Sequence, residues 1–166
     1  MKIILEGCDG TGKTTLAKIL AERYGLDICH CTQKDPADYE FYRQTLRKEN
    51  VIWDRHTLGE LIYPNVFARK PKIGVEDARL LMMYAREADV RTFVLTADLP
   101  TIRKRVEARG DEAPAIVENL KEIDTWFKFY ARQFHVPVIN TSEMSLREIF
   151  ELVETPQENK GGFYHG

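Results

Sequence analysis

The first twenty residues, 1-MKIILEGCDGTGKTTLAKIL-20, contain the pattern that decides the fold. They match G-x-x-x-x-G-K-[ST], a loop whose backbone N–H groups surround phosphates, whose lysine reaches the β- and γ-phosphates and whose threonine meets Mg²⁺. An apolar run at 2–6 predicts a strand before the loop, and apolar residues at helical spacing up to Gly25 predict a helix after it. We expect the phosphates to be bound by Gly7, Asp9, Gly10, Thr11, Gly12, Lys13, Thr14 and Thr15.

Length, composition and net charge limit which classes of protein this chain can belong to. The 166 residues are 43% hydrophobic and carry a formal net charge of −2, which predicts one ordinary soluble domain with a sizeable core. Because 24 Lys and Arg are balanced by 26 Asp and Glu, we expect no nucleic-acid polymer as a partner. The sequence has no apolar stretch near 18 residues and no charged leader, so we expect a cytoplasmic protein without membrane contact.

The three cysteines indicate a reducing compartment, since their number is odd. Cys29 and Cys31 flank a histidine but lack the two-residue gap of zinc sites, so we expect buried thiols on a strand.

Short apolar runs recur along the chain and alternate with helical patterns. Further strands are predicted within 26–31, 51–54, 92–96 and 136–140, with helical patterns at 78–88 and 116–134. This alternation predicts a doubly wound α/β domain of about five parallel strands, layered α/β/α, with its site at the carboxyl ends of the strands. We expect one domain over 1–154, with a helical lid at about 103–116 and a loose tail over 155–166.

The segment 51-VIWDRHTLGELIYPNVF-67 narrows the chemistry. Asp54 ends an apolar strand, where a carboxylate can hold Mg²⁺ through its water shell, and Arg55 follows directly. A GTPase would also need Asn-Lys-x-Asp after a strand to read guanine, and the "ENKGG" of the tail has no such aspartate.

The segments EGCDGTGKTT and DRHTLGELIY resemble the thymidylate kinase family, whose motifs are E-G-x-D-G-x-G-K-[ST]-T and D-R-[YH]-x-x-S-x-x-A-Y. The resemblance implies that Asp9 accepts a hydrogen bond from the 3′-hydroxyl of the acceptor sugar and that Arg55 binds the acceptor phosphate. It also implies acceptor contacts for Tyr63, which ends the second motif, and for Lys34, which stands where the family often has R-E-P.

A third segment, 99-LPTIRKRVEARGDE-112, places Arg105 and Arg109 on one helical face. They resemble the lid arginines of this kinase superfamily, which close over ATP and stabilise charge on the transferred phosphoryl group. Since the phosphate loop carries Gly10 and Thr11 and no arginine, we expect the catalytic cations to come from the lid.

The chain departs from the family at two positions that help to read thymine there. Gly59 replaces the serine and Pro64 follows the tyrosine, so neither supplies a polar side chain. We therefore expect an acceptor base other than thymine, or additional to it.

These observations predict a Mg²⁺- and ATP-dependent kinase for deoxynucleoside monophosphates, in which Lys13 neutralises the β/γ-phosphates while Thr14 and Asp54 hold the metal. One alternative is a deoxynucleoside kinase, which the 105-RVEARGDE-112 segment also resembles and in which Glu6 would act as base on a 5′-hydroxyl. Another is a nucleotide-binding module without turnover. The acceptor base and a possible homodimer are left open by the sequence.

Overall fold

The computed structural model describes residues 1–31, 35–110 and 114–156. Within them the chain forms one sheet of five parallel strands in the order β2-β3-β1-β4-β5. The strands are β1 (Lys2–Glu6), β2 (Asp27–His30), β3 (Val51–Asp54), β4 (Val90–Thr96) and β5 (Val138–Asn140). The helices are α1 (Lys13–Tyr24), α2 (Tyr39–Thr45), α3 (Thr57–Val66), α4 (Val75–Glu87), α5 (Leu99–Arg109), α6 (Pro114–Gln133) and α7 (Leu146–Glu154).

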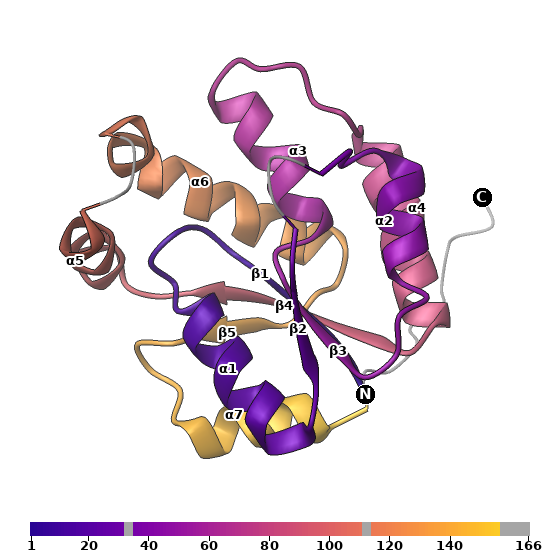
Figure 1. Ribbon diagram of the computed structural model, residues 1–166. Helices are drawn as coiled ribbons and strands as arrows, with labels where there is room; N and C mark the ends of the chain where they lie inside the picture. The colour runs from indigo at the N-terminus through magenta and orange to yellow at the C-terminus, as the bar shows by residue number, and fades with distance from the viewer. Residues whose placement is uncertain (32–34, 111–113, 157–166) are drawn as a thin grey trace.

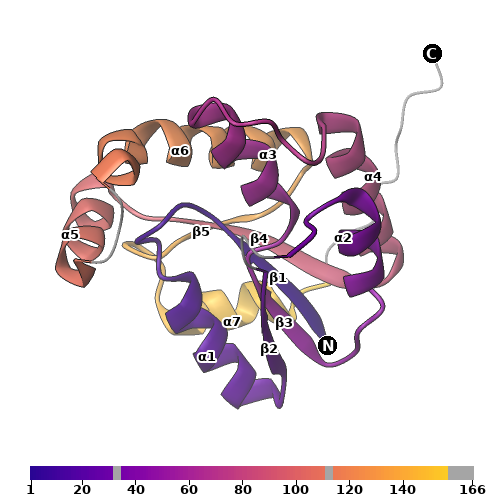
Figure 2. The ribbon, with the colours of Figure 1, turned by 45° about the horizontal axis from the view of Figure 1, so that its top comes forward.

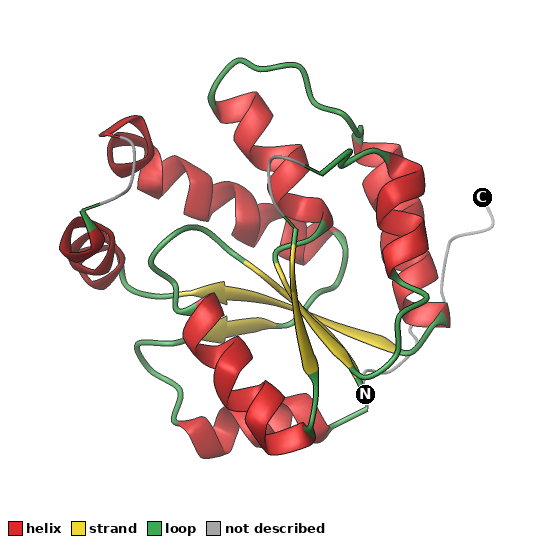
Figure 3. Ribbon diagram, in the orientation of Figure 1, coloured by secondary structure: helices red, strands yellow, loops and turns green. Residues whose placement is uncertain are grey.

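Helices cover both faces of the sheet, which confirms the predicted three-layer α/β/α architecture (Figure 3). Helices α1 and α7 lie on one face, and α2, α3, α4 and α6 lie on the other (Figure 1). Helix α5 lies at the β5 end of the sheet and packs against α6 (Figure 2). Parallel strands joined by helices produce this arrangement, because each crossover places a helix on a face.

The strands alternate their side chains between two apolar layers. On β1, Ile3 and Leu5 pack with α1 and α7, whereas Ile4 packs with α2 and α4 on the opposite face. All three are fully buried. A strand buried on both faces appears in the sequence as a continuous apolar run, which is why these strands could be predicted.

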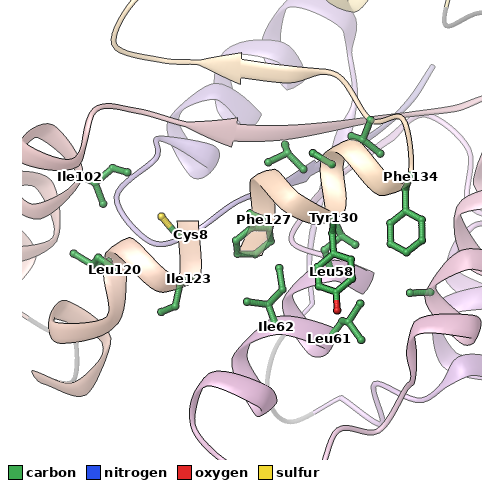
Figure 4. Packing of buried hydrophobic residues seen from close by; sticks show 14 of the residues in the cluster. Cys8, Leu58, Leu61, Ile62, Ile102, Leu120, Ile123, Phe127, Tyr130 and Phe134 are labelled. Carbon is green, nitrogen blue, oxygen red and sulfur yellow. The ribbon is translucent and has the colours of Figure 1, made fainter. Parts of the chain in front are cut away.

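A large cluster under α6 connects the phosphate loop to the helices of that face (Figure 4). Phe127 of α6 is buried among residues of α3, α5 and the loop, including Ile62, Ile102 and Cys8. Removing a buried phenylalanine from such a cluster typically costs about 3–5 kcal/mol. The apolar seam predicted over 116–134 therefore joins α5 to the phosphate loop.

Local signals explain where several helices begin and end. Helix α1 stops at Gly25, whose φ of 64° lies in the left-handed region that favours glycine. Ser145 and Glu148 form a capping box at the start of α7. Helix α3 has no such simple signal, because Pro64 within it is a helix breaker. It is held in place by the packing of Leu58, Leu61 and Ile62, which are all buried.

The topology fixes where the site lies. Strand β1 lies between β3 and β4, so the chain leaves its carboxyl end at the point where the strand order reverses. Ligands of doubly wound folds bind at this point, beyond the carboxyl ends of the strands. The phosphate loop follows β1 there, Asp54 ends β3, and Arg55 comes directly after it.

Candidate active site

The phosphate loop between β1 and α1 is shaped by close backbone contacts. A Cβ on Gly7 would lie 2.3 Å from the carbonyl oxygen of Leu95, and one on Gly10 would lie 2.7 Å from that of Ile102. Both glycines also have positive φ, 138° and 80°. Only glycine fits these positions, so the two residues press the loop against β4 and α5.

Lys13 begins α1 and its ammonium turns back into the loop. Its Nζ donates to the carbonyl of Cys8 at 2.6 Å, and the side chain is almost wholly buried. Burial lowers the pKa of Lys13 to about 8. A buried ammonium at a helix N-terminus is well suited to bind an anion. Within the described residues, no Asp or Glu forms an ion pair with Lys13.

The oxygens of Thr14 and Asp54 meet beside the loop. Thr14 Oγ1 donates to Asp54 Oδ2 at 2.6 Å, while Asp54 Oδ1 is buried and has no hydrogen-bond partner within the described residues. His30 at the end of β2 places Nδ1 3.3 Å from Asp54 Oδ2. One carboxylate and one hydroxyl fit Mg²⁺, which takes its remaining ligands from phosphates and water.

Nothing in the described parts of the chain resembles a protein-ligated metal centre, because they contain no group of three or more His, Cys, Asp or Glu arranged to hold an ion. Cys8 is buried and Cys29 and Cys31 are half-buried free thiols, and burial raises the pKa of Cys31 to about 12. None of the described helices is long and apolar enough to cross a membrane.

Asp9 is the centre of a second polar cluster. It is almost fully buried, forms an ion pair with Arg55 and accepts a hydrogen bond from the hydroxyl of Tyr63 at 2.7 Å. Burial acts to raise the pKa of Asp9, but the charges of Arg55 and Lys13 and the bond from Tyr63 outweigh it and hold that pKa below its usual range. Asp9 is therefore an anion that joins the loop to α3.

Arg55 reaches this cluster from an unusual backbone conformation. Its φ of 77° lies in the left-handed region, which costs a residue with a Cβ about 1 kcal/mol or more. Its backbone N–H donates to the carbonyl of Leu5, which holds the turn against β1. The Arg55 side chain is 38% exposed, so donors remain available to a ligand.

The Asp9 cluster opens into a cavity of about 510 Å³ between α3, the start of α6 and the loop that follows α3. The residues around it are aromatic or charged in large part: Asp9, Cys31, Tyr42, Arg55, His56, Gly59, Glu60, Tyr63, Pro64, Phe67, Arg69, Lys70, Lys72 and Ile116. Four of its charged residues are cations and two are anions, which suits an anionic ligand.

His56 supports the cavity wall as a neutral side chain. Its two ring nitrogens lie 2.8 Å from Thr45 Oγ1 and 2.7 Å from Thr57 Oγ1, and burial lowers its pKa to about 3. Tyr42 packs against its ring at a centroid distance of 4.8 Å. His56 thus ties α2 to the start of α3.

Glu6 lies beneath the loop and outside the cavity lining. It is fully buried, its Oε1 accepts from the backbone N–H of Leu58 at 2.7 Å, and its Oε2 has no hydrogen-bond partner within the described residues. Burial raises the pKa of Glu6 to about 7. The hydrogen bond of its Oε1 is to the first turn of α3, and it is absent from the lining of the cavity.

Arg105 of α5 contacts the outer side of the loop. Its Nη1 donates to the carbonyl of Gly10 at 3.2 Å and to Thr141 Oγ1 at 3.1 Å. Thr141 follows β5 and donates in turn to the carbonyl of Thr11. Arg109 lies one turn further along α5, on the exposed surface.

The remaining predicted site residues are placed less centrally. Thr11 is buried and bonds through its hydroxyl to the carbonyl of Cys8, and Thr15 is exposed on α1. Lys34 lies outside the described residues.

Several site residues carry no sequence motif. Thr141 follows β5 and His30 ends β2, so the folded sheet brings them to the site, whereas Phe67 reaches it from the end of α3. The sequence offers one indication that His30 and Thr141 belong to the site: each lies at or just after the carboxyl end of a predicted strand.

Known proteins resemble the chain along most of its length. A family model described as an AAA domain matches residues 3–125. "Cytidylate kinase 2" of Borreliella afzelii is 25% identical, with 92% of this chain and 94% of the relative covered. "Probable thymidylate kinase" of Methanocaldococcus jannaschii is 24% identical, with 90% of this chain and 91% of the relative covered.

Solved structures resemble the fold as well. The YorR protein of Bacillus subtilis, solved in complex with phosphorylated GDP, superposes with a TM-score of 0.77 at 23% identity, covering 93% of this chain and 96% of that one. At this identity the likeness establishes a shared fold.

Proposed function

This chain belongs to the AAA domain family, and on that premise we propose that it transfers the γ-phosphoryl group of ATP to the phosphate of a deoxynucleoside monophosphate. Relatives named as cytidylate and thymidylate kinases match along nine tenths of their length, which supports a phosphotransferase that acts on nucleoside monophosphates. The deoxyribose and the choice of base rest on the geometry of the cavity.

The cluster of Arg55, Asp9 and Tyr63 carries the proposal. Asp9 accepts from the Arg55 guanidinium, which has five N–H donors in a planar fork. The donors that Asp9 leaves free suit a phosphate dianion in the cavity. The cluster adjoins the phosphate loop, so an acceptor phosphate on Arg55 lies on the side from which the γ-phosphate of ATP is reached.

The donor side of the reaction rests on the phosphate loop. Lys13 exchanges its bond to the Cys8 carbonyl for the β/γ-phosphate oxygens, and the first N–H groups of α1 bind the same phosphates. Thr14 and Asp54 would hold Mg²⁺, which when bound neutralises negative charge on the phosphates. The bond from the γ-phosphorus to the bridging oxygen breaks, and a bond to an acceptor phosphate oxygen forms.

Tyr63 supports a preference for deoxyribose. Its hydroxyl occupies Asp9 Oδ2, and Arg55 pairs with Oδ1. One sugar hydroxyl can share this carboxylate, whereas a second would compete with the tyrosine. We therefore assign the 3′-hydroxyl to Asp9 and expect a 2′-hydroxyl to be disfavoured.

Burial of Glu6 favours a monophosphate over a nucleoside as acceptor. A nucleoside's 5′-hydroxyl needs a base within about 3 Å, and Glu6 is covered and bonded to Leu58. A phosphate acceptor is already an anionic nucleophile and needs no such base.

Steady-state phosphoryl transfer from ATP, with Mg²⁺ present, tests the proposal across three acceptor sets: deoxynucleoside monophosphates, the matching ribonucleotides and the matching deoxynucleosides. We expect the first set to have the highest kcat/KM for at least two bases. Transfer to nucleosides alone would support the deoxynucleoside kinase, and binding of ATP without any transfer would support the non-catalytic module.

A further inference from the structure

The far end of the cavity has a chemical character of its own. Asp9 and Arg55 lie at the loop end, while Phe67, Arg69 and Lys70 follow α3 and line the other end. If the acceptor phosphate binds Arg55, as proposed above, the acceptor base lies toward the second end. What this end recognises therefore decides the base.

An aromatic wall leads from the sugar position to this end. The rings of Tyr63 and Phe67 are stacked, with centroids 6.3 Å apart and planes inclined by 24°. Phe127 of the buried cluster packs edge-on against Tyr63 at 6.2 Å and supports it from behind. Since the Tyr63 hydroxyl is bonded to Asp9, one side chain spans the sugar and base positions and its orientation is fixed at both ends. A base packs well against such a wall, because base and aromatic faces stack favourably.

The wall has room for a purine. Gly59 lines the cavity one turn before Tyr63, and a Cβ added there would meet only the Tyr63 ring, at 3.9 Å. The cavity of about 510 Å³ is thus left open over α3 where the related family carries a serine.

Hydrogen-bond donors dominate the edge of the wall. The guanidinium of Arg69 lies over the Phe67 ring, 5.5 Å from its centroid, so it borders the space beside the aromatic wall. Glu60 is the carboxylate at this end, and its Oε1 already accepts from the backbone N–H of Lys72 at 3.2 Å. Lys72 is also engaged, because its ammonium donates to the carbonyl of Asp35. Arg69 and Lys70 are exposed cations beside the opening.

We propose that this end of the cavity selects bases that carry a carbonyl at purine C6 or pyrimidine C4, with guanine preferred, and that Arg69 is the residue that reads it. Guanine presents O6 and N7, two acceptors that fit the two-pronged guanidinium, and thymine or uracil presents one carbonyl, O4, at the corresponding edge. Adenine and cytosine place an amino group at the corresponding edge, where it would face a cation. Guanine gains a bidentate contact, thymine and uracil gain a single contact, and the amino groups of adenine and cytosine gain none.

The test measures kcat/KM of the full chain for dGMP, dTMP, dAMP and dCMP, with ATP and Mg²⁺, in the wild type and in Arg69→Met. The variant keeps an unbranched apolar side chain and removes the charge and the donors. Arg147→Met is the matched control, because Arg147 is 87% exposed on α7 across the sheet from the cavity and undergoes the same change of charge.

We expect the wild type to favour dGMP, then dTMP, over dAMP and dCMP. Arg69→Met should reduce the ratio of dGMP to dAMP roughly 10-fold, chiefly through KM for dGMP, as expected for loss of one bidentate contact. In Arg147→Met, the ratio of kcat/KM for dGMP over dAMP should equal that of the wild type. A wild-type preference for dAMP or dCMP, or an Arg69→Met ratio equal to the wild-type ratio, overturns the assignment.

This experiment separates the base assignment from the proposed function. If the enzyme phosphorylates nucleosides instead, the same ratio is read from deoxyguanosine and deoxyadenosine, and Arg69→Met must still reduce it. If no acceptor is phosphorylated, calorimetric binding of dGMP and dAMP to both forms gives the ratio, and equal affinities for the two nucleotides overturn the assignment.

Discussion

The hydroxyl of Tyr63 lies 2.7 Å from Oδ2 of Asp9, although the two residues are 54 positions apart in the chain. This bond fixes α3 against the phosphate loop and places an aromatic ring along the acceptor cavity. Burial raises the pKa of Tyr63 well above its ordinary value, so the phenol stays protonated and donates across the physiological range. The acceptor site is therefore built around one carboxylate shared by a cation and a phenol.

Tyr63→Phe should weaken the preference for deoxyribose. The substitution frees Asp9 Oδ2 to accept a hydrogen bond from a 2′-hydroxyl while the ring stays in place. We expect the ratio of kcat/KM for dGMP over GMP to fall roughly 10-fold or more, the worth of one hydrogen bond to a charged group. The acceptor assays measure it directly, and an unchanged ratio would place the sugar away from Asp9.

Lys13→Met should abolish phosphoryl transfer without unfolding the protein. It removes a preorganised charge from the reacting centre, which typically lowers kcat by about 10²-fold or more. Lys18→Met is the control, since Lys18 is exposed on the same helix. Thermal unfolding confirms that both variants fold, and near-normal turnover by folded Lys13→Met would exclude the kinase assignment.

Arg105→Ala and Arg109→Ala test the lid. Arg105 holds the Gly10 carbonyl and Thr141, so its loss loosens the outer side of the phosphate loop. If both arginines stabilise charge on the transferred phosphoryl group, each variant should lower kcat more than it weakens acceptor binding. Acceptor Kd from calorimetry supplies the comparison. An equal loss in kcat and in acceptor affinity would make them binding residues instead.

Glu6→Gln should change how stability depends on pH. Because burial raises the pKa of Glu6 to about 7, the folded state holds the proton more tightly than the unfolded chain does. This contribution is fully present below about pH 4.5 and is lost as the pH rises through about 7. The glutamine variant cannot ionise, so its stability relative to the wild type should rise over this range by roughly 1–3 kcal/mol.

Urea unfolding at pH 4.5, 6 and 8 measures this difference. Glu122→Gln on the exposed side of α6 is the control and should show no such trend. A constant offset between Glu6→Gln and the wild type would mean that Glu6 titrates near its ordinary pKa in the folded protein.

The sheet and the phosphate loop could be predicted because their signals are local. A buried parallel strand is an apolar run, and the loop needs glycine where a Cβ would strike Leu95 and Ile102. Asp54 and Arg55 were recognisable because a charged pair directly after such a run lies at the carboxyl edge of the sheet.

Other parts of the site depend on packing between distant segments. Pro64 is a helix breaker, so the sequence pattern does not predict α3. Helix α3 nevertheless forms and brings Tyr63 and Phe67 together one turn apart. Thr141 contacts Arg105 only because β5 lies beside β4. Sequence patterns place the chemistry at one edge of the sheet, and the contacts between helices decide which side chains share the cavity.

The central claim is that Arg55 binds the phosphate of the acceptor, and its most direct test is the ratio of kcat/KM for dGMP over deoxyguanosine in the wild type and in Arg55→Gln. The glutamine cannot offer a charged fork to a dianion. We predict that the wild type prefers the monophosphate at least 100-fold and that Arg55→Gln, still folded by circular dichroism, reduces this ratio at least 10-fold. A wild type that prefers deoxyguanosine, or an Arg55→Gln ratio equal to the wild-type ratio, would contradict the account.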